Sequence, residues 1–246
     1  MADSAVAAAV SAAAELRVTG KAAIDNGSDN IMNDLLKRFL AEQDKQLIEA
    51  RIREAEKRTS GEIVVKIAPA SSRYPGAALL GSSMLSLAFS LLGMLVAGNR
   101  DMWMFLAVFA VLFMVLHELF RRCAVCRRPF VSVSDMQMEV EDAASGAFVR
   151  LGVHDTAGRT GILIYISVFE RRVRVIADRG INEKVEPHLW QEVVDTIIAG
   201  IRSNRQGMAI AAAIDRCGGI LALHFPRQPD DRNELSDSVV MGRSRP

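Results

Sequence analysis

One long stretch of this sequence is almost free of charge. Between Tyr74 and Leu116, Arg100 and Asp101 are the only Asp, Glu, Lys or Arg residues, whereas these four types make up 24% of the whole chain. The overall hydrophobic content of 50% is therefore an average over two unlike parts. This distribution is typical of a soluble protein that contains a membrane segment.

Two apolar runs of membrane-spanning length lie within this stretch. Residues 77–96 contain no charged side chain, and residues 102–120 carry His117 and Glu118 only near their end. A helix rises about 1.5 Å per residue, so each run can span the roughly 30 Å of a hydrocarbon core. The short connection between the runs allows only an antiparallel turn. We therefore predict a two-helix transmembrane hairpin over residues 76–120. The alternative is a helical hairpin buried in a soluble core.

Basic residues flank both outer ends of the predicted hairpin. Arg73 precedes the first span, and the second span is followed by Arg121, Arg122, Arg127 and Arg128. The connecting turn offers only Arg100. By the positive-inside rule, both soluble parts and both termini face the cytoplasm. The first residues lack a basic start and a strongly apolar run, so they do not resemble a secretory signal. We expect a protein integral to the cell (inner) membrane.

Net charge and cysteine content narrow the class of protein. A net charge of +1 argues against a dedicated nucleic-acid binder, which would show a basic excess. Three cysteines cannot form a disulfide framework. Cys123 and Cys126 form a CxxC beside the predicted membrane, but zinc would need two more ligands. We interpret this pair as cytosolic thiols or, alternatively, as a site of juxtamembrane acylation. Cys217 falls on the apolar face of a predicted helix and is assigned to the core.

The remaining residues alternate between helical and strand patterns. Strands are predicted at residues 62–67, 161–167 and 172–178, and the last two form an antiparallel hairpin. Helices are predicted at residues 31–58, 135–151 and 187–201, and from about residue 207 onward. The first two strands are joined by a helical crossover and should be parallel. The predicted fold class is α/β: a small three-layer α/β/α domain with a short mixed sheet, interrupted by the transmembrane hairpin.

The chain divides into six segments on this basis. Residues 1–30 form an Ala-rich tail and residues 228–246 a polar tail, both predicted to be disordered. The segments between them are the N-terminal helices and first strand (31–75), the transmembrane hairpin (76–120), a basic juxtamembrane linker (121–130) and the remainder of the domain (131–227).

Four segments of the sequence resemble the TPM domain family, named for a thylakoid-lumen protein, a photosystem repair protein and a receptor modulator. They are TSGEIVV at 59–65, ISVFERRVRVIADRGI at 166–181, the pattern of Trp190, Val193 and Val194, and CGGILALHFPR at 217–227. The chain looks most like bacterial membrane proteins of this family in which a hairpin interrupts the domain. The resemblance implies an α/β/α fold. Since some plant members are described as weak acid phosphatases and calcium binders, it also implies these two activities as hypotheses.

Three carboxylates are candidate ligands for Mg²⁺ or Ca²⁺. Asp178 ends one predicted strand, Glu62 begins another, and Asp155 lies in the loop before the central strand. Carboxylate oxygens bind hard cations, and a bound cation can polarise a phosphate. Arg159 and Arg179 are the candidate catalytic residues, which would hold that phosphate.

Four arginines gather around the predicted strand hairpin: Arg171, Arg172, Arg174 and Arg179. They could bind a phosphate or an anionic lipid headgroup. In the alternative interpretation they are solvated or pair with nearby acids. In particular, Asp178 could pair with Arg172 or Arg174 and only order the turn.

Two functions from different classes follow from these observations. The first is non-catalytic: a membrane-anchored TPM module that binds, assembles or maintains a membrane protein complex. The second is a metal-dependent phosphatase that acts on phosphomonoesters through the residues above. The sequence has no nucleophile elbow, zinc-protease motif or dinucleotide fingerprint. The expected partners are the membrane and a membrane protein, not nucleic acid. The candidate carboxylates suggest Mg²⁺ or Ca²⁺ as the cofactor.

Overall fold

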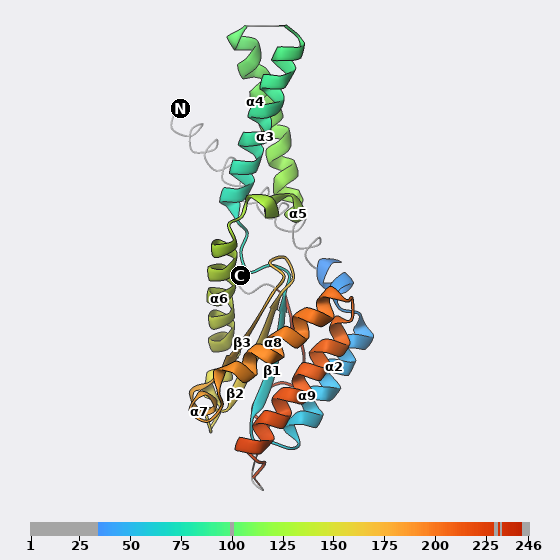
Figure 1. Ribbon diagram of the computed structural model, residues 1–246, viewed down its shortest axis with the longest axis vertical. Coiled ribbons are helices and arrows are strands. Elements are labelled where there is room, and N and C mark those ends of the chain that lie inside the picture. Colours follow the sequence, from blue (N-terminus) through green and yellow to red (C-terminus); the bar gives the residue numbers. More distant parts are fainter. Residues whose placement is uncertain (1–33, 99–100, 229–230, 232, 243–246) are drawn as a thin grey trace, which may run out of the picture.

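The computed structural model describes residues 34–98, 101–228, 231 and 233–242. The predicted tail at residues 1–30 lies outside this range. A four-stranded sheet in the order β3-β2-β1-β4 forms the centre of the domain, and helices surround it (Figure 1). The strands are β1 (Glu62–Ala68), β2 (Gly161–Ser167), β3 (Arg172–Ala177) and β4 (Val240–Met241). The predicted mixed α/β class is confirmed.

The two central strands are parallel neighbours although they are far apart in the sequence. β1 and β2 pair over their full length, from Glu62 opposite Gly161 to Ala68 opposite Ser167. β3 pairs antiparallel with β2 after a tight turn. Both pairings agree with the predictions. Every residue of β1 and β2 is buried, as expected for strands that are covered on both faces.

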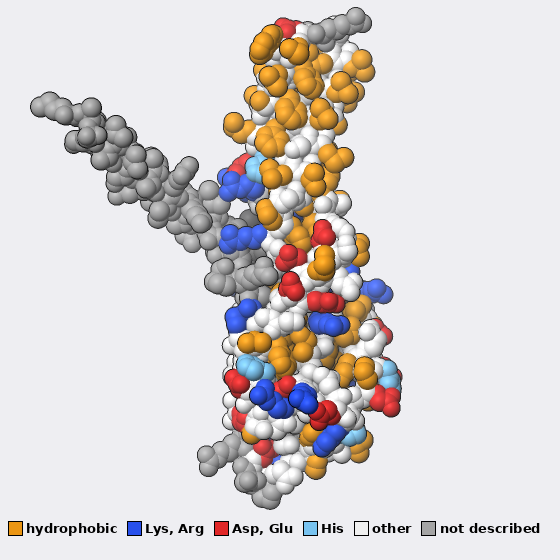
Figure 2. All heavy atoms as spheres, turned by 90° about the vertical axis from the view of Figure 1, so that its left-hand side faces the viewer, with side chains coloured by type: hydrophobic (Ala, Val, Ile, Leu, Met, Phe, Trp, Pro, Cys, Tyr) orange, Lys and Arg blue, Asp and Glu red, His pale blue; other side chains and the backbone are white. Residues whose placement is uncertain are grey.

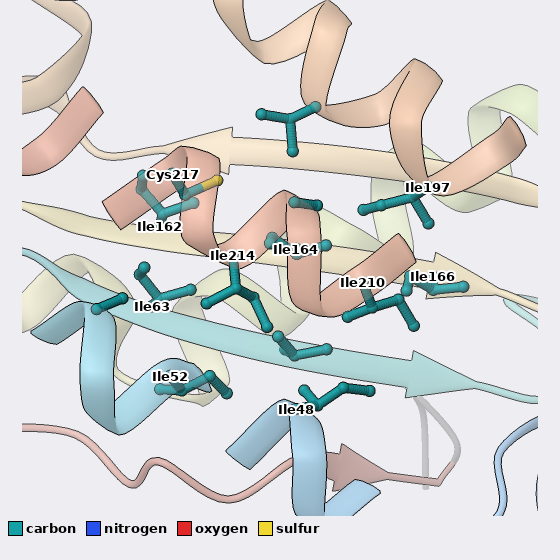
Figure 3. Close-up of a cluster of buried hydrophobic side chains, with 14 of the residues drawn as sticks. Ile48, Ile52, Ile63, Ile162, Ile164, Ile166, Ile197, Ile210, Ile214 and Cys217 are labelled. Atoms are coloured by element: carbon teal, nitrogen blue, oxygen red, sulfur yellow. The ribbon is translucent and has the colours of Figure 1, made fainter. Parts of the chain in front are cut away.

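Three of the described helices cover one face of the sheet: α2 (Glu42–Glu56), α8 (Pro187–Arg202) and α9 (Gln206–His224). Ile48 and Ile52 of α2 and Ile210 and Ile214 of α9 face the isoleucines of the strands (Figure 3). Burying one such side chain stabilises the fold by about 1.5–3 kcal/mol. This layer of isoleucines is the main core of the domain.

The other face of the sheet packs against α6 (Val133–Arg150). This helix begins two residues before its predicted start. Its contact surface is built mainly from small side chains, Ala143, Ala144 and Ala147, which lie against Leu163 and Tyr165 of β2. Because alanine adds little bulk, the helix can lie close to the strands and still bury the aromatic ring of Tyr165.

A pair of antiparallel helices, α3 (Pro75–Val96) and α4 (Met102–Arg122), projects from the domain (Figure 1). Both helices are long and apolar enough to cross a membrane, and so is α9 by length and composition. The most apolar window of α9 is 44% buried, against 22% for α3 and 6% for α4. Hydrophobic side chains cover the visible surface of this α3–α4 hairpin (Figure 2). Exposed apolar surface on this scale marks contact with lipid or protein.

Small residues of α3 form its contact with α4. Ser82, Ser86 and Ser90 are buried, and the hydroxyl groups of Ser82 and Ser90 donate to backbone carbonyls one turn earlier, at 2.7 and 2.6 Å. A Cβ atom on Gly81 would lie 2.3 Å from Cε1 of Phe120, so any larger residue would require the Phe120 ring or the helix to shift. The small side chains therefore allow the two helices to approach closely.

The base of the hairpin packs against the domain. Tyr74, Ala77 and Met136 form a buried apolar cluster at this junction. The ring of Phe120 meets Phe130 edge-on, with ring centroids 5.6 Å apart. The chain after α4 folds into α5 (Ala124–Arg127) and a 3-10 turn η1 (Arg128–Phe130). The segment that the sequence predicts as a linker, residues 121–130, is thus helical over most of its length and packed at the junction.

The prediction for the C-terminal residues is also wrong in part. The sequence predicts a disordered tail over residues 228–246, but β4 pairs in parallel with β1, with Lys66 opposite Val240. Val239 is buried in the main core, and its N–H donates to Oε1 of Glu49 at 3.1 Å. The reason is local: Val239, Val240 and Met241 form a short apolar run, which is enough to pair with the free edge of β1.

Candidate functional site

The candidate metal ligands and catalytic arginines gather at one end of the sheet, and most of the predicted arginine cluster lies toward the other end. The carboxyl ends of β1 and β2 point toward the α3–α4 hairpin, because the chain passes from β1 directly into α3 (Figure 1). We call this the hairpin end and the opposite end the distal end. β3 runs antiparallel, so Asp178 at its close lies at the distal end with Glu62. Ligand sites of open α/β sheets usually lie at the carboxyl ends of parallel strands, which here is the hairpin end.

Glu62 is buried at the distal end, with 6% of its surface exposed. Its Oε1 accepts a hydrogen bond from the N–H of Glu234 at 3.1 Å, while Oε2 has no hydrogen-bond partner among the described residues. Burial raises the pKa of Glu62, and the hydrogen bond from Glu234 opposes that rise. Glu62 lines a cavity of about 210 Å³ together with Glu56 and Asp237.

Glu56 is the second perturbed acid of this cavity. Its Oε1 accepts from the N–H of Ile63 at 2.9 Å. Burial, together with the negative charges of Glu62 and Asp237, raises the pKa of Glu56 to about 8. A carboxyl group with this pKa is largely protonated at neutral pH and is then a weak ligand for a cation.

Asp178 is the N-terminal cap of the short helix α7 (Arg179–Asn182). Its Oδ1 accepts from the N–H of Arg179 at 2.7 Å, and Oδ2 has no hydrogen-bond partner among the described residues. Within that part of the chain Asp178 forms no ion pair with Arg172 or Arg174. Asp178 therefore does order the turn, as the alternative interpretation proposed, but by capping a helix and not through an arginine.

The other three candidates are exposed near Asp178. The guanidinium of Arg179 pairs with Glu183 at 3.0 Å. Asp155 lies 3.2 Å from the ring Nε2 of His154, and the guanidinium of Arg159 donates to the carbonyl of His154. The loop and α7 are neighbours, because the N–H of Gly180 donates to the carbonyl of Arg159 at 3.1 Å.

The three candidate metal ligands share one end of the domain but are engaged separately. In residues 34–98, 101–228, 231 and 233–242, no three His, Cys, Asp or Glu side chains form a group that could hold a metal ion. The three carboxylates thus do not form a complete cation site by themselves. Mg²⁺ commonly binds through one or two protein carboxylates plus substrate phosphate oxygens. A site of that kind would be complete only with substrate bound.

Glu170 organises the hairpin end and was not identified from the sequence. It is 3% exposed, and its Oε1 accepts from the N–H of Ser71 at 2.9 Å and from the hydroxyl of Tyr74 at 2.8 Å. The hydroxyl of Ser167 donates to Oε2. Ser71 in turn lies 3.2 Å from the hydroxyl of Tyr165. This network ties the turn after β2 to the segment that enters α3.

The predicted arginine cluster is divided by the structure. Arg179 lies at the distal end, whereas Arg171, Arg172 and Arg174 line a cavity of about 570 Å³ beside the edge strand β3. Arg128 of η1 and Arg202 at the end of α8 line the same cavity. We call this cavity the arginine pocket. Sequence reasoning missed Arg128 and Arg202 because only tertiary packing brings these distant segments together.

The three cysteines lie in two different environments. The sulfur atoms of Cys123 and Cys126 lie 2.8 Å apart at the hairpin base. Cys217 is fully buried in the main core, as predicted, and burial raises the pKa of its thiol to about 12. A thiol with this pKa is unreactive at neutral pH.

One segment of the chain matches a known protein family. Residues 129–220, from η1 into α9, match the family model described as TPM domain. The chain carries a TPM domain. Among curated protein sequences no match is found. The fold is similar to the NMR structure of the BA42 protein from the psychrophilic bacterium Bizionia argentinensis, with a TM-score of 0.52 and 22% sequence identity. That similarity covers 83% of this chain and 96% of the BA42 chain and concerns the fold alone.

The matched part of the TPM domain contains most of the candidate residues. Asp155, Asp178 and the arginines at 159 and 179 lie inside it, whereas Glu62 on β1 precedes it. The arginine pocket also belongs largely to the matched part, and Arg128 stands immediately before its first residue. Both ends of the sheet therefore present residues of the TPM domain.

Proposed function

We propose that this protein is a membrane-anchored TPM-domain protein that binds, assembles or maintains a membrane protein complex. In this proposal α3 and α4 cross the cell (inner) membrane. The TPM domain and both termini face the cytoplasm, in accordance with the basic residues that flank both outer ends of the hairpin.

The observation that carries this proposal is the fixed junction between the hairpin and the sheet. Glu170 holds Ser71 and Tyr74 at the start of α3, and Phe120 at the end of α4 packs on Phe130. A domain on a flexible tether would sample many orientations. The packed junction restricts the orientation of this domain relative to its helices, which suits a module that presents one surface to a neighbouring membrane protein.

Site-specific photo-cross-linking in native membranes tests this function. A photoreactive residue replaces Leu80, which is exposed on α3 near the domain, in the tagged full-length chain. The control position is Leu223, exposed near the end of α9. We expect a discrete protein adduct from position 80 and none from position 223. Adducts with lipid alone at position 80, or the same adducts from both positions, would contradict the proposal.

A metal-dependent phosphatase acting on phosphomonoesters is the second candidate function. The observation that favours it is at the distal end, where Glu62 and Asp178 are both buried and each has one carboxylate oxygen without a hydrogen-bond partner among the described residues. Their strands flank β2 on either side. In this function Mg²⁺ or Ca²⁺ would be held by Glu62, Asp178 and Asp155, and Arg159 or Arg179 would bind the phosphate.

This second function is tested with the purified full-length chain and a generic phosphomonoester in the presence of Mg²⁺, Mn²⁺ or Ca²⁺. Asp178→Asn keeps an oxygen that can cap α7 but removes the negative charge. Asp135→Asn, an exposed change on α6, is the matched control. The phosphatase proposal requires metal-dependent activity that is lost in Asp178→Asn and kept in the control. Activity that survives Asp178→Asn would be assigned to a contaminant, and absence of activity in the unmodified chain would exclude this function.

A further inference from the structure

The arginine pocket carries more positive charge than its surroundings neutralise. Five arginines line it, against two carboxylates. Among the described residues none of the five arginines forms an ion pair. The one hydrogen bond found for these five guanidinium groups runs from Arg172 to the backbone carbonyl of Val133 at 3.4 Å. The guanidinium groups therefore keep most of their capacity to donate hydrogen bonds.

The two carboxylates of the pocket, Glu141 and Glu170, accept hydrogen bonds from neutral donors and form no ion pair with the five arginines. Glu170 accepts hydrogen bonds from Ser71, Tyr74 and Ser167, and Glu141 accepts from the side chain of Gln137 at 3.4 Å. Burial and the nearby positive charge of Arg171 both lower the pKa of Arg128, even though Glu170 acts in the opposite direction. The two carboxylates thus offset only part of the charge of the five arginines, and the pocket keeps an excess of positive charge.

The pocket also has an apolar wall. Between the arginines lie aliphatic side chains from α6, β3 and α8: Val140, Val173, Val194, Ile198 and Ile201. A site for a small free anion needs no such wall. Guanidinium groups next to aliphatic side chains fit a ligand that has a phosphate at one end and hydrocarbon at the other.

The location of the pocket agrees with such a ligand. Arg171 lies in the turn directly after Glu170, whose carboxyl group holds Tyr74 at the start of α3. Arg128 belongs to η1, which follows α4 and α5 at the hairpin base. The pocket is therefore at the hairpin end, beside the point where α3 and α4 leave the domain.

We propose that the arginine pocket binds the phosphate group of an anionic phospholipid. Guanidinium groups of β3 and η1 donate paired hydrogen bonds to the phosphate oxygens, and the aliphatic wall contacts the glycerol and the first methylene groups. The recognition of phosphate follows from the pocket itself. The supply of the ligand from a bilayer rests on the proposed membrane anchoring.

Binding is measured on the purified full-length chain in an uncharged detergent. Short-chain phosphatidylglycerol, short-chain phosphatidylcholine and glycerol 3-phosphate are titrated separately by calorimetry. We expect the tightest binding for phosphatidylglycerol. The double variant Arg172→Gln/Arg174→Gln should weaken that binding by about tenfold or more, since each arginine near an anionic lipid contributes on the order of 1 kcal/mol. The single variant Arg174→Gln, at an exposed side chain, covers the case in which the double variant does not fold.

A matched control distinguishes binding in the pocket from nonspecific attraction by surface charge. Arg122→Gln removes the same charge from the end of α4, where Arg122 pairs with Glu118 at 2.8 Å outside the pocket. Equal weakening by Arg122→Gln, unchanged binding in the pocket variants, or equally tight binding of phosphatidylcholine would overturn the proposal. Glycerol 3-phosphate that binds as tightly as the lipid would assign the pocket to a soluble phosphate ester instead. Because these ligands are added in detergent solution, the result does not depend on the cross-linking test of the proposed function.

Discussion

The hydroxyl of Tyr74 donates a hydrogen bond of 2.8 Å to Oε1 of Glu170, and this bond joins the residue that precedes α3 to the turn between β2 and β3. Burial, together with the negative charge of Glu170, raises the pKa of Tyr74, so the phenol stays protonated and remains a donor. The bond thus connects the hairpin to the sheet over the whole physiological pH range.

Removing this hydroxyl should loosen the junction. Tyr74→Phe keeps the ring contact with Phe169 but leaves Glu170 with one donor fewer in a buried position. We expect a loss of about 1–3 kcal/mol in the free energy of unfolding, measured by thermal melting of the full-length chain in detergent. Tyr74→Leu, which also removes the ring, should cost more. Equal melting temperatures for Tyr74→Phe and the unmodified chain would show that the hydrogen bond does not contribute to the stability of the fold.

The contact between α3 and α4 should depend on one glycine. Gly81→Ala places a Cβ 2.3 Å from the ring of Phe120, so the helices must separate or the ring must move. We expect a destabilisation of about 1–3 kcal/mol. Gly93→Ala in the same helix has nothing within 4 Å and is the control; better helix propensity should leave it neutral or slightly stabilised. The comparison is made by thermal melting, and similar losses for both variants would argue against close packing at Gly81.

Two adjacent glycines of α9 provide a similar test of the main core. A Cβ on Gly218 would lie 2.7 Å from the Cβ of Ala55 on α2, whereas a Cβ on Gly219 has nothing within 4 Å. Gly218→Ala should destabilise the domain by about 1–3 kcal/mol, because α2 and α9 must move apart. Gly219→Ala should be neutral or stabilising by up to about 1 kcal/mol. A reversed order in melting temperature would show that α2 does not pack on α9 in this register.

The raised pKa of Glu56 predicts that stability falls as pH rises. The folded-state pKa is about 8 and the ordinary value is 4.5, so between these values the folded chain binds more protons than the unfolded chain. The contribution of Glu56 to stability is thus fully present below about pH 4.5 and is lost progressively up to about pH 8. Glu56→Gln still offers an oxygen to the N–H of Ile63 but does not titrate.

Melting curves from pH 5 to pH 9 measure this effect as the difference between Glu56→Gln and the unmodified chain. We expect the variant to gain about 1–3 kcal/mol relative to the unmodified chain at the alkaline end, allowing for partial exposure of the group. Glu54→Gln, at an exposed position of the same helix, is the control. A difference that stays constant with pH would show that the carboxyl group of Glu56 is ionised like an exposed one.

The last strand should contribute measurably to the core. Val239→Ala removes buried methyl groups between α2 and the sheet and should cost about 1–3 kcal/mol. Val240→Ala, at a half-buried position one residue later, should cost less. Hydrogen exchange of the backbone amides on β1 measures locally whether β4 remains paired with β1. Unchanged protection of these amides in Val239→Ala would mean that β4 does not cover this edge of β1.

The strands and the two apolar helices were predictable because each follows from a local pattern. The nearly continuous apolar run of β2, the alternation of arginine with apolar residues at the start of β3 and the long apolar runs of α3 and α4 are visible without tertiary information. β4 was not predictable from the sequence, because two residues in a polar segment form a strand only where a sheet edge, here that of β1, is free to pair with them. The apolar run from Val239 to Met241 was the available signal.

The candidate site was harder to predict because strand direction decides which residues meet. Asp178 closes a strand, but that strand is antiparallel, so the residue lies at the amino ends of β1 and β2. Glu170 looked like an ordinary turn residue, yet its carboxyl group is buried among three donors. The arginine pocket could not be predicted because Arg128 and Arg202 come from segments distant from β3 in the sequence. No rule of sequence spacing links these positions.

The parallel pairing of β1 with β2 has a consequence for the order of events during synthesis. The ribosome makes β1 first, then both apolar helices, and only afterwards the strand that completes the pairing. β1 must therefore wait, with both of its edges open, until α3 and α4 have been made. In the proposed topology, in which α3 and α4 cross the membrane, the chain must also return to the side of β1 before β2 can pair with it. A hairpin that failed to return would, in that topology, leave β2 on the wrong side and the domain unformed. Completion of the sheet would then report correct placement of the hairpin, and a partly inserted chain would expose the unpaired edges of β1 to proteases.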